Sequence, residues 1–302
     1  MLKINFLILI LLFMVLLSIA FLTLFERKFL GYLQVRKGPA KVSVSGLLQP
    51  LSDGVKLFMK SGNSIFISNK FLFYMFPFMM LLMMFMYWMI FIFDSLVSFS
   101  FSLVYFMMVS SISVYGVLGS GWVSNSKYAI IGAYRSVAQV VSYEVGMVFL
   151  MMIFVMFSMN YSINSVFLMN NFSHLKFFGF LLVWFIWIVV IMAELNRAPF
   201  DFAESESELV SGFNLEFGGV KFAFMFLGEY GNILFMSYLT MGMFHSFSLY
   251  YLLMYLIILI LVRGVYPRFR YDNLMYLNWK IYLPLIMVLY LFLFMFKYSM
   301  LC

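Results

Sequence analysis

The residues most able to do chemistry in this sequence are carboxylates, and half of them gather in residues 193–216. This stretch reads A-E-L-N-R-A-P-F-D-F-A-E-S-E-S-E-L-V-S-G-F-N-L-E and contains Glu194, Asp201, Glu204, Glu206, Glu208 and Glu216. Apolar runs flank it at 177–192 and 222–243. Carboxylates that repel one another beside a low-dielectric region have raised pKa values, so they can bind and release protons near neutral pH. The alternative is a solvated loop whose charges serve solubility, but Glu194 and Glu216 lie close to the apolar runs.

Two more acids, Glu144 and Glu229, occur in apolar surroundings. Glu144 ends the motif V-S-Y-E at 141–144, where we expect a membrane edge. Glu229 lies about two turns into the run 222–243, too deep for a carboxylate to reach water easily. Ionisable side chains inside a membrane usually mark proton relays or substrate paths. We therefore expect Glu144, Glu194 and Glu229, on three helices near one membrane depth, to form a proton relay; for Glu144 the alternative is a structural ion pair with an arginine.

The composition places these carboxylates in a membrane protein. Hydrophobic residues make up 65% of the chain and charged residues 10%, whereas soluble domains have about 25% charged residues. The single cysteine, Cys302, excludes an internal disulfide and a cysteine-ligated iron–sulfur cluster, and His174 and His245 lack a metal-ligand spacing. The sequence has neither a G-x-G-x-x-G dinucleotide motif nor a phosphate-binding P-loop. We therefore expect no metal and no redox cofactor. We also expect no nucleic-acid partner, because the basic residues cluster beside apolar segments.

Apolar windows of about 20 residues predict eight transmembrane helices. They cover residues 4–25, 71–93, 98–118, 141–158, 176–193, 222–243, 247–265 and 281–298. The first run has no small-residue cleavage site, so we interpret it as a retained helix and not as a signal peptide. The predicted fold is all-α, a polytopic membrane protein that forms a single integral membrane domain over residues 1–302.

The charged residues are distributed unequally between the two sides of the predicted bundle. Eight spans put both termini on one side. The loops on the other side are 26–70, 119–140, 194–221 and 266–280. These loops and their flanks contain all basic residues except Lys3, Lys176 and Lys297, and all acids except Asp94. Because positive residues favour the cytoplasmic side, the long loops should face the cytoplasm or, in a mitochondrion, the matrix, where a large soluble assembly could dock.

Two further segments have distinctive sequence patterns, one amphipathic and one strongly basic. In residues 47–60 apolar residues recur at helical spacing while Asp53 and lysines take another face, which predicts an amphipathic helix lying in the membrane interface. This helix either anchors the chain or forms the lip of an entry for a lipid-like molecule. The segment 263–272 is strongly basic. Its Arg268 and Arg270 could neutralise the acidic stretch, or bind an acidic partner or lipid headgroups.

Several motifs together resemble a known family of membrane proteins. They are E-R-K at 26–28, R-K-G-P at 36–39, G-L-L-Q-P at 46–50, V-S-Y-E at 141–144, A-E-L-N-R-A-P-F-D-F-A-E-S-E-S-E-L-V-S-G-F-N at 193–214, E-Y at 229–230 and P-R-F-R-Y-D at 267–272. With these motifs the sequence resembles the chain 1 family of mitochondrial NADH–ubiquinone oxidoreductase, respiratory complex I, over nearly its whole length. The family more often has T-N-R-T-P and G-E-S-E where this chain has L-N-R-A-P from 195 and S-E-S-E from 205, and neither departure removes a charge.

The resemblance implies an eight-helix subunit of the mitochondrial inner membrane that carries no redox centre. It would form the membrane end of the ubiquinone tunnel in a proton-translocating NADH:ubiquinone reductase and have no isolated activity. NADH, FMN and iron–sulfur clusters would be bound by partner subunits. Those partners would be the matrix-side subunits that hold the quinone site and the last iron–sulfur cluster, and small membrane subunits leading to the antiporter-like subunits. Membrane lipids would surround the chain.

Carried over by position, the resemblance also assigns roles to individual residues. The residues that line or brace the tunnel would be Arg27, Arg36, Asp53, Arg135, Arg197, Asp201, Glu204, Arg263 and Arg268. The proton-linked charge step would be carried by Glu144, Glu194 and Glu229. Residues that hold loop conformations would be Glu206 and Glu208, and we place Glu216 and Arg270 with them.

Two other functions remain as alternatives. A stand-alone ion transporter would more often show an internal repeat and polar residues at the membrane midplane, and ion transport by the monomer in liposomes would favour it. The related membrane subunit of a proton-pumping hydrogenase shares the family's ancestry but needs a different soluble partner. Co-purification with a quinone-reducing module would favour the oxidoreductase subunit, and co-purification with a nickel-bearing module would favour the hydrogenase subunit.

Overall fold

The structure is a computed structural model that describes residues 2–62, 69–97, 99–169, 178–202, 212–214, 216–245 and 248–301. Throughout these ranges the regular structure is helical. The longer helices are α1 (Leu2–Leu33), α3 (Lys70–Val97), α4 (Ser102–Val123), α5 (Lys127–Ser158), α7 (Phe178–Glu194), α9 (Val220–Phe244), α10 (Leu249–Val265) and α12 (Leu283–Leu301). The short elements are η1 (Val44–Gly46), α2 (Gln49–Met59), α6 (Ile163–Met169), η3 (Gly212–Asn214), α11 (Tyr271–Leu277) and the π-helical turn η4 (Asn278–Tyr282).

Each of the predicted spans coincides with one of the longer helices. Those long and apolar enough to cross a membrane are Phe6–Leu33, Lys70–Phe93, Ser102–Val123, Lys127–Ser158 and Tyr271–Met295, while α7 and α10 are shorter apolar helices. Helix α9 has 25 residues but carries Lys221, Glu229 and Asn232, which lower its hydropathy. The prediction of an all-α polytopic membrane protein is confirmed.

The prediction of a loop at 119–140 is wrong. Helix α5 already begins at Lys127, and only residues 124–126 separate it from α4, so Glu144 lies at the middle of a 32-residue helix and not near its start. Several polar residues of this stretch, namely Ser120, Ser124, Ser136 and Gln139, are buried. Ser136, for example, donates to the Ala133 carbonyl oxygen at 2.9 Å, so its hydroxyl group is satisfied within its own helix. Buried polar residues of this kind lower the hydropathy of a helix without exposing it to water.

Other expected loops are also shorter than predicted. Helix α1 continues to Leu33, so the charged motif at 26–28 lies inside its last turns and not beyond its end. In the expected loop 266–280, α11 and η4 form a continuous helical path into α12. The amphipathic helix expected at 47–60 is present as α2, with Pro50 in its first turn, where proline's missing N–H has no helical partner to lose.

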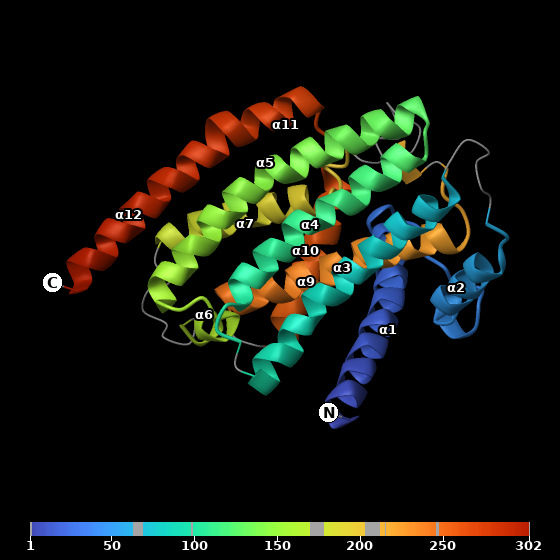
Figure 1. The fold of residues 1–302 in the computed structure, drawn as a ribbon, viewed down its shortest axis with the longest axis horizontal. Coiled ribbons are helices and arrows are strands. Elements are labelled where there is room, and N and C mark those ends of the chain that lie inside the picture. The colour runs from blue at the N-terminus through green and yellow to red at the C-terminus, as the bar shows by residue number, and fades with distance from the viewer. Residues whose placement is uncertain are drawn as a thin grey trace.

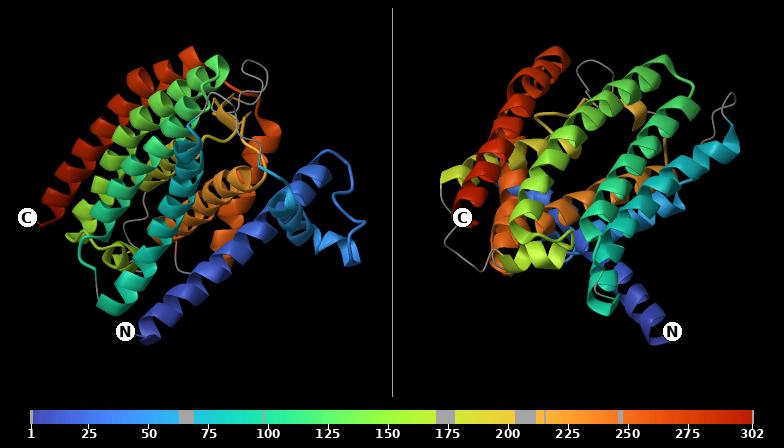
Figure 2. Two further views of the ribbon diagram at one scale, coloured as in Figure 1. Left: turned by 45° about the vertical axis from the view of Figure 1, so that its right-hand side comes forward. Right: turned by 60° about the vertical axis from the view of Figure 1, so that its left-hand side comes forward.

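Helix α3 packs between α4 and α9, and α5 packs on the other side of α4 (Figures 1 and 2). Glycines of α9 bring it close to α3. A Cβ atom on Gly228 would lie 3.1 Å from the Met80 carbonyl oxygen, and one on Gly231 would lie 2.2 Å from the Met84 side chain. Glu229 stands between these glycines, so the close approach also holds its backbone against α3.

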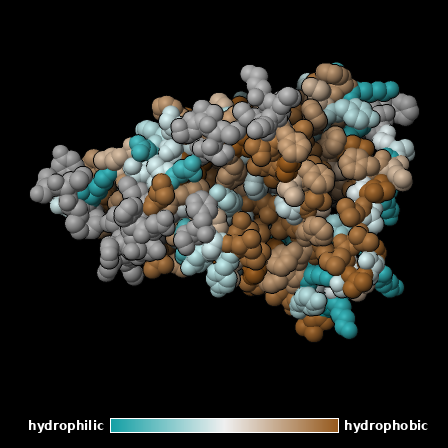
Figure 3. All heavy atoms as spheres, turned by 90° about the horizontal axis from the view of Figure 1, so that it is seen from below, coloured by the Kyte–Doolittle hydropathy of each residue, from teal (hydrophilic) through white to brown (hydrophobic). Residues whose placement is uncertain are grey.

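The ends of the helices divide into two groups. In Figure 1 the two termini, the α3–α4 turn and α6 lie towards the lower and left part of the molecule, whereas the α4–α5 turn and α2 lie towards the right. Termini at one end fit an even number of crossings. Between the ends the surface is apolar, as the brown middle of the face in Figure 3 shows. Large side chains such as Phe13, Phe185 and Val288 are exposed, as expected for helices that face lipid.

Candidate functional site

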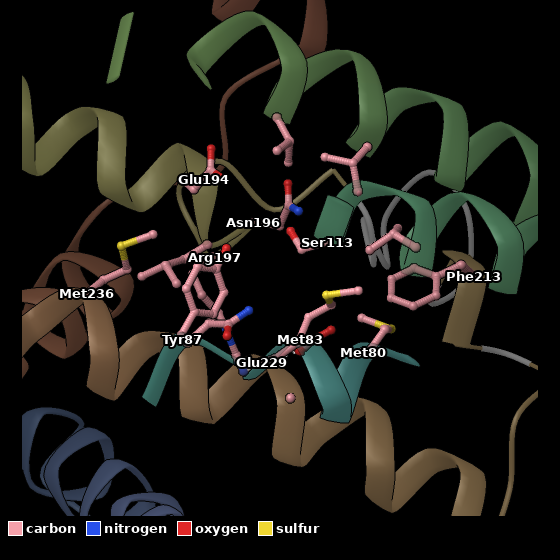
Figure 4. A pocket seen from close by; sticks show the side chains of 16 residues that line it. Met80, Met83, Tyr87, Ser113, Glu194, Asn196, Arg197, Phe213, Glu229 and Met236 are labelled. Carbon is pink, nitrogen blue, oxygen red and sulfur yellow. Dashed lines mark hydrogen bonds and ion pairs between the residues drawn. The ribbon is translucent and has the colours of Figure 1, made fainter. Parts of the chain in front are cut away.

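A cavity of about 70 Å³, here called the central cavity, lies among α3, α4, α7 and α9 (Figure 4). Its polar lining consists of Tyr87, Ser113, Glu194, Asn196, Arg197, Glu229 and Asn232. Its apolar lining includes Met80, Met83, Val114, Val117, Val140, Phe213 and Met236. A cavity of this size with polar walls can hold several water molecules. The central cavity therefore unites two of the predicted relay acids, Glu194 and Glu229, with the predicted tunnel residue Arg197.

The position of Glu194 is set by the end of α7 and by a glutamine from α5. Helix α7 ends at Glu194, and the chain turns at once through Asn196, which has a φ of 49° and donates to the Ala193 carbonyl oxygen at 3.3 Å. Buried Gln139 donates through Nε2 to the carbonyl oxygens of Ala193 at 2.8 Å and Phe200 at 2.9 Å. Carbonyl groups at a helix end have no partner within the helix. Gln139 thus fastens both sides of the turn to α5.

Arg197 leaves this turn and pairs with Glu229 of α9. Its Nη2 atom lies 3.5 Å from Glu229 Oε2, and the two side chains are only 14% and 22% exposed. The guanidinium carbon also lies 4.5 Å from the centre of the Tyr230 ring, within range of a cation–π interaction. Opposite charges that are mostly removed from water depend strongly on each other, because removal of one leaves the other desolvated. The structure thus gives Glu229 a partner from the acidic stretch itself.

Glu194 and Glu144, which the sequence predicts to belong to a relay, lie within electrostatic range of each other. Glu194 Oε2 and Glu144 Oε1 are both buried, and within the described ranges neither accepts a hydrogen bond. Glu144 does not line the central cavity; it lies on α5 beside Ser110 of α4. Two carboxyl groups in one low-dielectric region disfavour double ionisation, so the proton occupancy of one affects the other.

A second cavity of about 30 Å³ adjoins the first on the side of α1 and α10. Arg197 and Leu195 line both cavities. In the second cavity Glu26 of α1 forms an ion pair with Arg263 of α10. Glu26 was not among the candidate site residues named from the sequence, yet it is only 7% exposed. The signal available in the sequence was the E-R-K motif at the end of an apolar run. A lysine there can extend its long side chain to water, whereas a glutamate cannot.

Among the remaining tunnel candidates that the structure describes, Arg27, Asp53 and Arg36 lie near the surface, whereas Asp201 is buried. Arg27 pairs with Asp53 of α2 at 2.7 Å, with side chains 45% and 36% exposed. Arg268 approaches Asp201 at 3.6 Å, with Asp201 buried. Arg36 is exposed after the end of α1.

The predicted neutralisation of the acidic stretch by the basic segment 263–272 is present only in part. The Phe269 amide donates to the Pro199 carbonyl oxygen at 3.0 Å, so the basic segment does lie against the acidic stretch. Arg270, in contrast, pairs with Asp272 of its own segment at 3.0 Å, and both are largely exposed.

Arg135 lies on α5, and Glu216 follows η3 and is half-buried. The expected tunnel residue Glu204 and the loop residues Glu206 and Glu208 lie outside the described residues.

Sequence reasoning missed several groups that line the central cavity. Tyr87, Ser113, Asn196 and Asn232 were not among the candidates. Single hydroxyl and amide groups within apolar runs carry no spacing signal. Only the packing of α3, α4 and α9 brings them to one place.

Comparison with known proteins adds an independent observation. A family model described as NADH dehydrogenase matches residues 6–294 of the chain. The chain belongs to the NADH dehydrogenase family. Among curated members, "NADH-ubiquinone oxidoreductase chain 1" of Rhipicephalus sanguineus is 48% identical over 279 residues, which cover 91% of this chain and 89% of that protein. The proteins of the same description from Anopheles gambiae and Lampetra fluviatilis are each 45% identical, covering 90% and 93% of this chain and 88% and 92% of theirs.

Membership of the NADH dehydrogenase family agrees with the resemblance carried by the acidic stretch. The matched region runs from the first turns of α1 into α12, so it includes every helix that lines the two cavities. Similarity over this span places the central cavity within the part of the chain that relatives share.

Proposed function

We propose that this chain is a core membrane subunit of a proton-translocating NADH–ubiquinone oxidoreductase in the mitochondrial inner membrane. Membership of the NADH dehydrogenase family supports the proposal that the chain belongs to this oxidoreductase. The charged lining of the central cavity supports its proposed role in linking quinone reduction to proton movement. The observation that carries the proposal is the Arg197–Glu229 pair, which links the acidic stretch to a membrane helix beside Glu194. In this role the chain forms the membrane end of the ubiquinone tunnel and carries no redox centre.

Ubiquinone reduction takes up two electrons and two protons, and it creates transient negative charge before the protons arrive. Electrons come from NADH through FMN and iron–sulfur clusters in partner subunits. Negative charge near residues 195–216 attracts Arg197 and weakens its hold on Glu229. Glu229 then becomes a better proton acceptor, and the change in its charge alters proton occupancy at Glu194 and onward at Glu144. The three acids thereby link reduction of the quinone to movement of protons.

The peripheral residues fit a path for a lipid-like substrate. Helix α2 has an exposed apolar face that includes Leu51, Val55 and Phe58, which suits contact with the membrane interface. The Arg27–Asp53 pair ties this helix to α1. Together with Arg36, Arg135, Arg263, Arg268, Asp201 and Glu204, these charged groups line or brace the passage from the interface to the acidic stretch. The passage opens on the matrix side, where the quinone-site and iron–sulfur subunits dock; small membrane subunits carry the relay onward.

Substitution of the relay acids in the intact oxidoreductase tests the proposal. Glu194→Gln and Glu229→Gln each remove a proton site while keeping size and polarity. We expect each to lower NADH-driven ubiquinone reduction and proton pumping at least tenfold, while oxidation of NADH by ferricyanide, which bypasses the membrane part, is unchanged. Asp272→Asn, at the exposed pair with Arg270, is the matched control and should leave both activities intact. Full pumping in both relay variants would overturn the proposal.

A further inference from the structure

Tyr87 of α3 occupies a place that neither the motifs nor the proposed relay uses. Its side chain is 2% exposed and lines the central cavity with Glu194 of α7 and Ser113 of α4 (Figure 4). The phenol lies within electrostatic range of Glu194 and of Glu144, and close enough to Ser113 for their hydroxyl groups to interact.

The ring of Tyr87 is held by aromatic packing on two sides. It stacks on Phe235 at 5.1 Å between ring centres and contacts Phe106 at 5.7 Å. A phenylalanine would fill this site equally well. A buried hydroxyl group costs free energy unless it is hydrogen-bonded. Packing therefore accounts for the ring of Tyr87 but not for its hydroxyl group, which faces the polar cavity.

Two serines extend from Tyr87 towards Glu144. Ser113 and Ser110 lie one turn apart on α4, and at rest each hydroxyl group donates to a backbone carbonyl oxygen of its own helix, Ser113 Oγ to Ser110 at 2.7 Å and Ser110 Oγ to Met107 at 2.8 Å. Ser110 lies beside Glu144. Serine hydroxyl groups rotate freely about one bond and can both donate and accept a proton. Once the two serine hydroxyl groups rotate towards each other, the order across the interface is Glu194, Tyr87, Ser113, Ser110 and Glu144.

We propose that the hydroxyl groups of Tyr87, Ser113 and Ser110 form a proton-conducting bridge between Glu194 and Glu144. The bridge rests on the proposed function and specifies the route between two of its acids. It requires no titration of the hydroxyl groups themselves, because each gives up a proton only as it receives another.

The transfer is balanced at every atom. Protonated Glu194 loses its O–H bond as the Tyr87 oxygen accepts that proton, and Tyr87 passes its own proton to Ser113. Ser113 passes its proton to Ser110, and Ser110 to the carboxylate of Glu144. One O–H bond forms for each that breaks, and the three hydroxyl groups end neutral. One proton has moved from Glu194 to Glu144, and one negative charge has moved the opposite way.

The test uses Tyr87→Phe, Ser113→Ala and the double variant in the intact oxidoreductase. We expect each single variant to lower NADH-driven ubiquinone reduction roughly tenfold and to raise its solvent deuterium isotope effect, because proton transfer becomes rate-limiting. The double variant should be no worse than Tyr87→Phe alone, since one break already interrupts the bridge. NADH oxidation by ferricyanide should stay at the wild-type rate in all three.

Matched controls come from the same helix pair. Tyr105→Phe removes a phenol that donates to the Met86 carbonyl oxygen of α3, and Ser111→Ala removes a neighbouring hydroxyl group that faces away. Neither should change turnover or the isotope effect.

The outcomes separate this proposal from the one on which it rests. Wild-type turnover and isotope effect in Tyr87→Phe, with Glu194→Gln inactive, would overturn the bridge and leave the relay intact. Activity in Glu194→Gln as well would overturn the relay itself. If Tyr87→Phe does not assemble, Ser113→Ala decides: reduced turnover with a raised isotope effect supports the bridge, and wild-type behaviour overturns it.

Discussion

The central cavity and the peripheral ion pairs use the same residue types in opposite surroundings. In the cavity, Arg197 and Glu229 are 14% and 22% exposed, and Glu194 Oε2 is buried without a hydrogen bond from the described residues. At the periphery, Arg27–Asp53 and Arg270–Asp272 are from 36% to 77% exposed. Water screens the peripheral pairs, so each contributes little free energy. The buried charges instead depend on one another, because removal of one leaves its partner desolvated.

This contrast teaches where charge chemistry can be coupled to structure. A charge that water can solvate changes its state without consequence for its neighbours. A charge inside the helix bundle cannot do so, which suits Glu194 and Glu229 to a relay and the peripheral pairs to fastening segments together.

The largest expected effect comes from breaking the buried pair from one side. Arg197→Gln leaves Glu229 without its counter-charge in a mostly dry site, so we expect the unfolding free energy to fall by about 3–5 kcal/mol. Thermal unfolding of the purified oxidoreductase would measure this as early release of the subunit. The double variant Arg197→Gln/Glu229→Gln should recover most of the stability while remaining inactive. An Arg197→Gln variant as stable as the wild type would show that the two regions do not differ as described.

Much of the fold could be predicted because lipid imposes a simple rule. Helices in a membrane must satisfy their own backbone and present apolar side chains, so apolar runs located α1, α3, α7, α9 and the others. The rule failed at α5, whose first half carries Ser136 and Gln139 in helix–helix contacts. Hydropathy cannot distinguish a polar residue that faces water from one that faces another helix.

The candidate site was predicted only in part for a related reason. Glu194 and Glu229 stood out because charges are rare in apolar surroundings, and Arg197 was named only through the family resemblance. Tyr87 and Ser113 did not, because a phenol or a hydroxyl group is common in membrane helices and gains its role from the side chains that packing places beside it. The pairing of Arg197 with Glu229, 32 residues apart, likewise follows from the turn after α7 and from no spacing rule.

A smaller loss of stability is expected at Gln139, which holds the turn after α7 in place but does not line the central cavity. Gln139→Leu keeps the volume but removes the donor to the Ala193 and Phe200 carbonyl oxygens. Two buried acceptors then lose their partner, at about 1–3 kcal/mol each. Unfolding in detergent should show this loss, with turnover reduced in proportion to the displacement of Glu194. Ser136→Ala on the same helix, whose hydroxyl group bonds only within α5, is the control and should cost less than about 1 kcal/mol. Equal losses in the two variants would contradict the supporting role of Gln139.

The smallest effect is expected at the periphery, where Asp53→Asn removes one charge of the exposed pair with Arg27. Asparagine can still accept the hydrogen bond that Gln49 Nε2 donates at 2.9 Å. Stability should therefore change by less than about 1 kcal/mol, and the change should vanish at high salt, because exposed pairs are screened. If α2 forms the lip of the quinone path, KM for a long-tailed quinone should rise roughly threefold, a change of about 0.65 kcal/mol, while kcat stays constant. Asp272→Asn should match it in stability but leave KM unchanged. A fall in kcat as large as that of Glu229→Gln would instead place Asp53 with the buried relay and erase the distinction between the two regions.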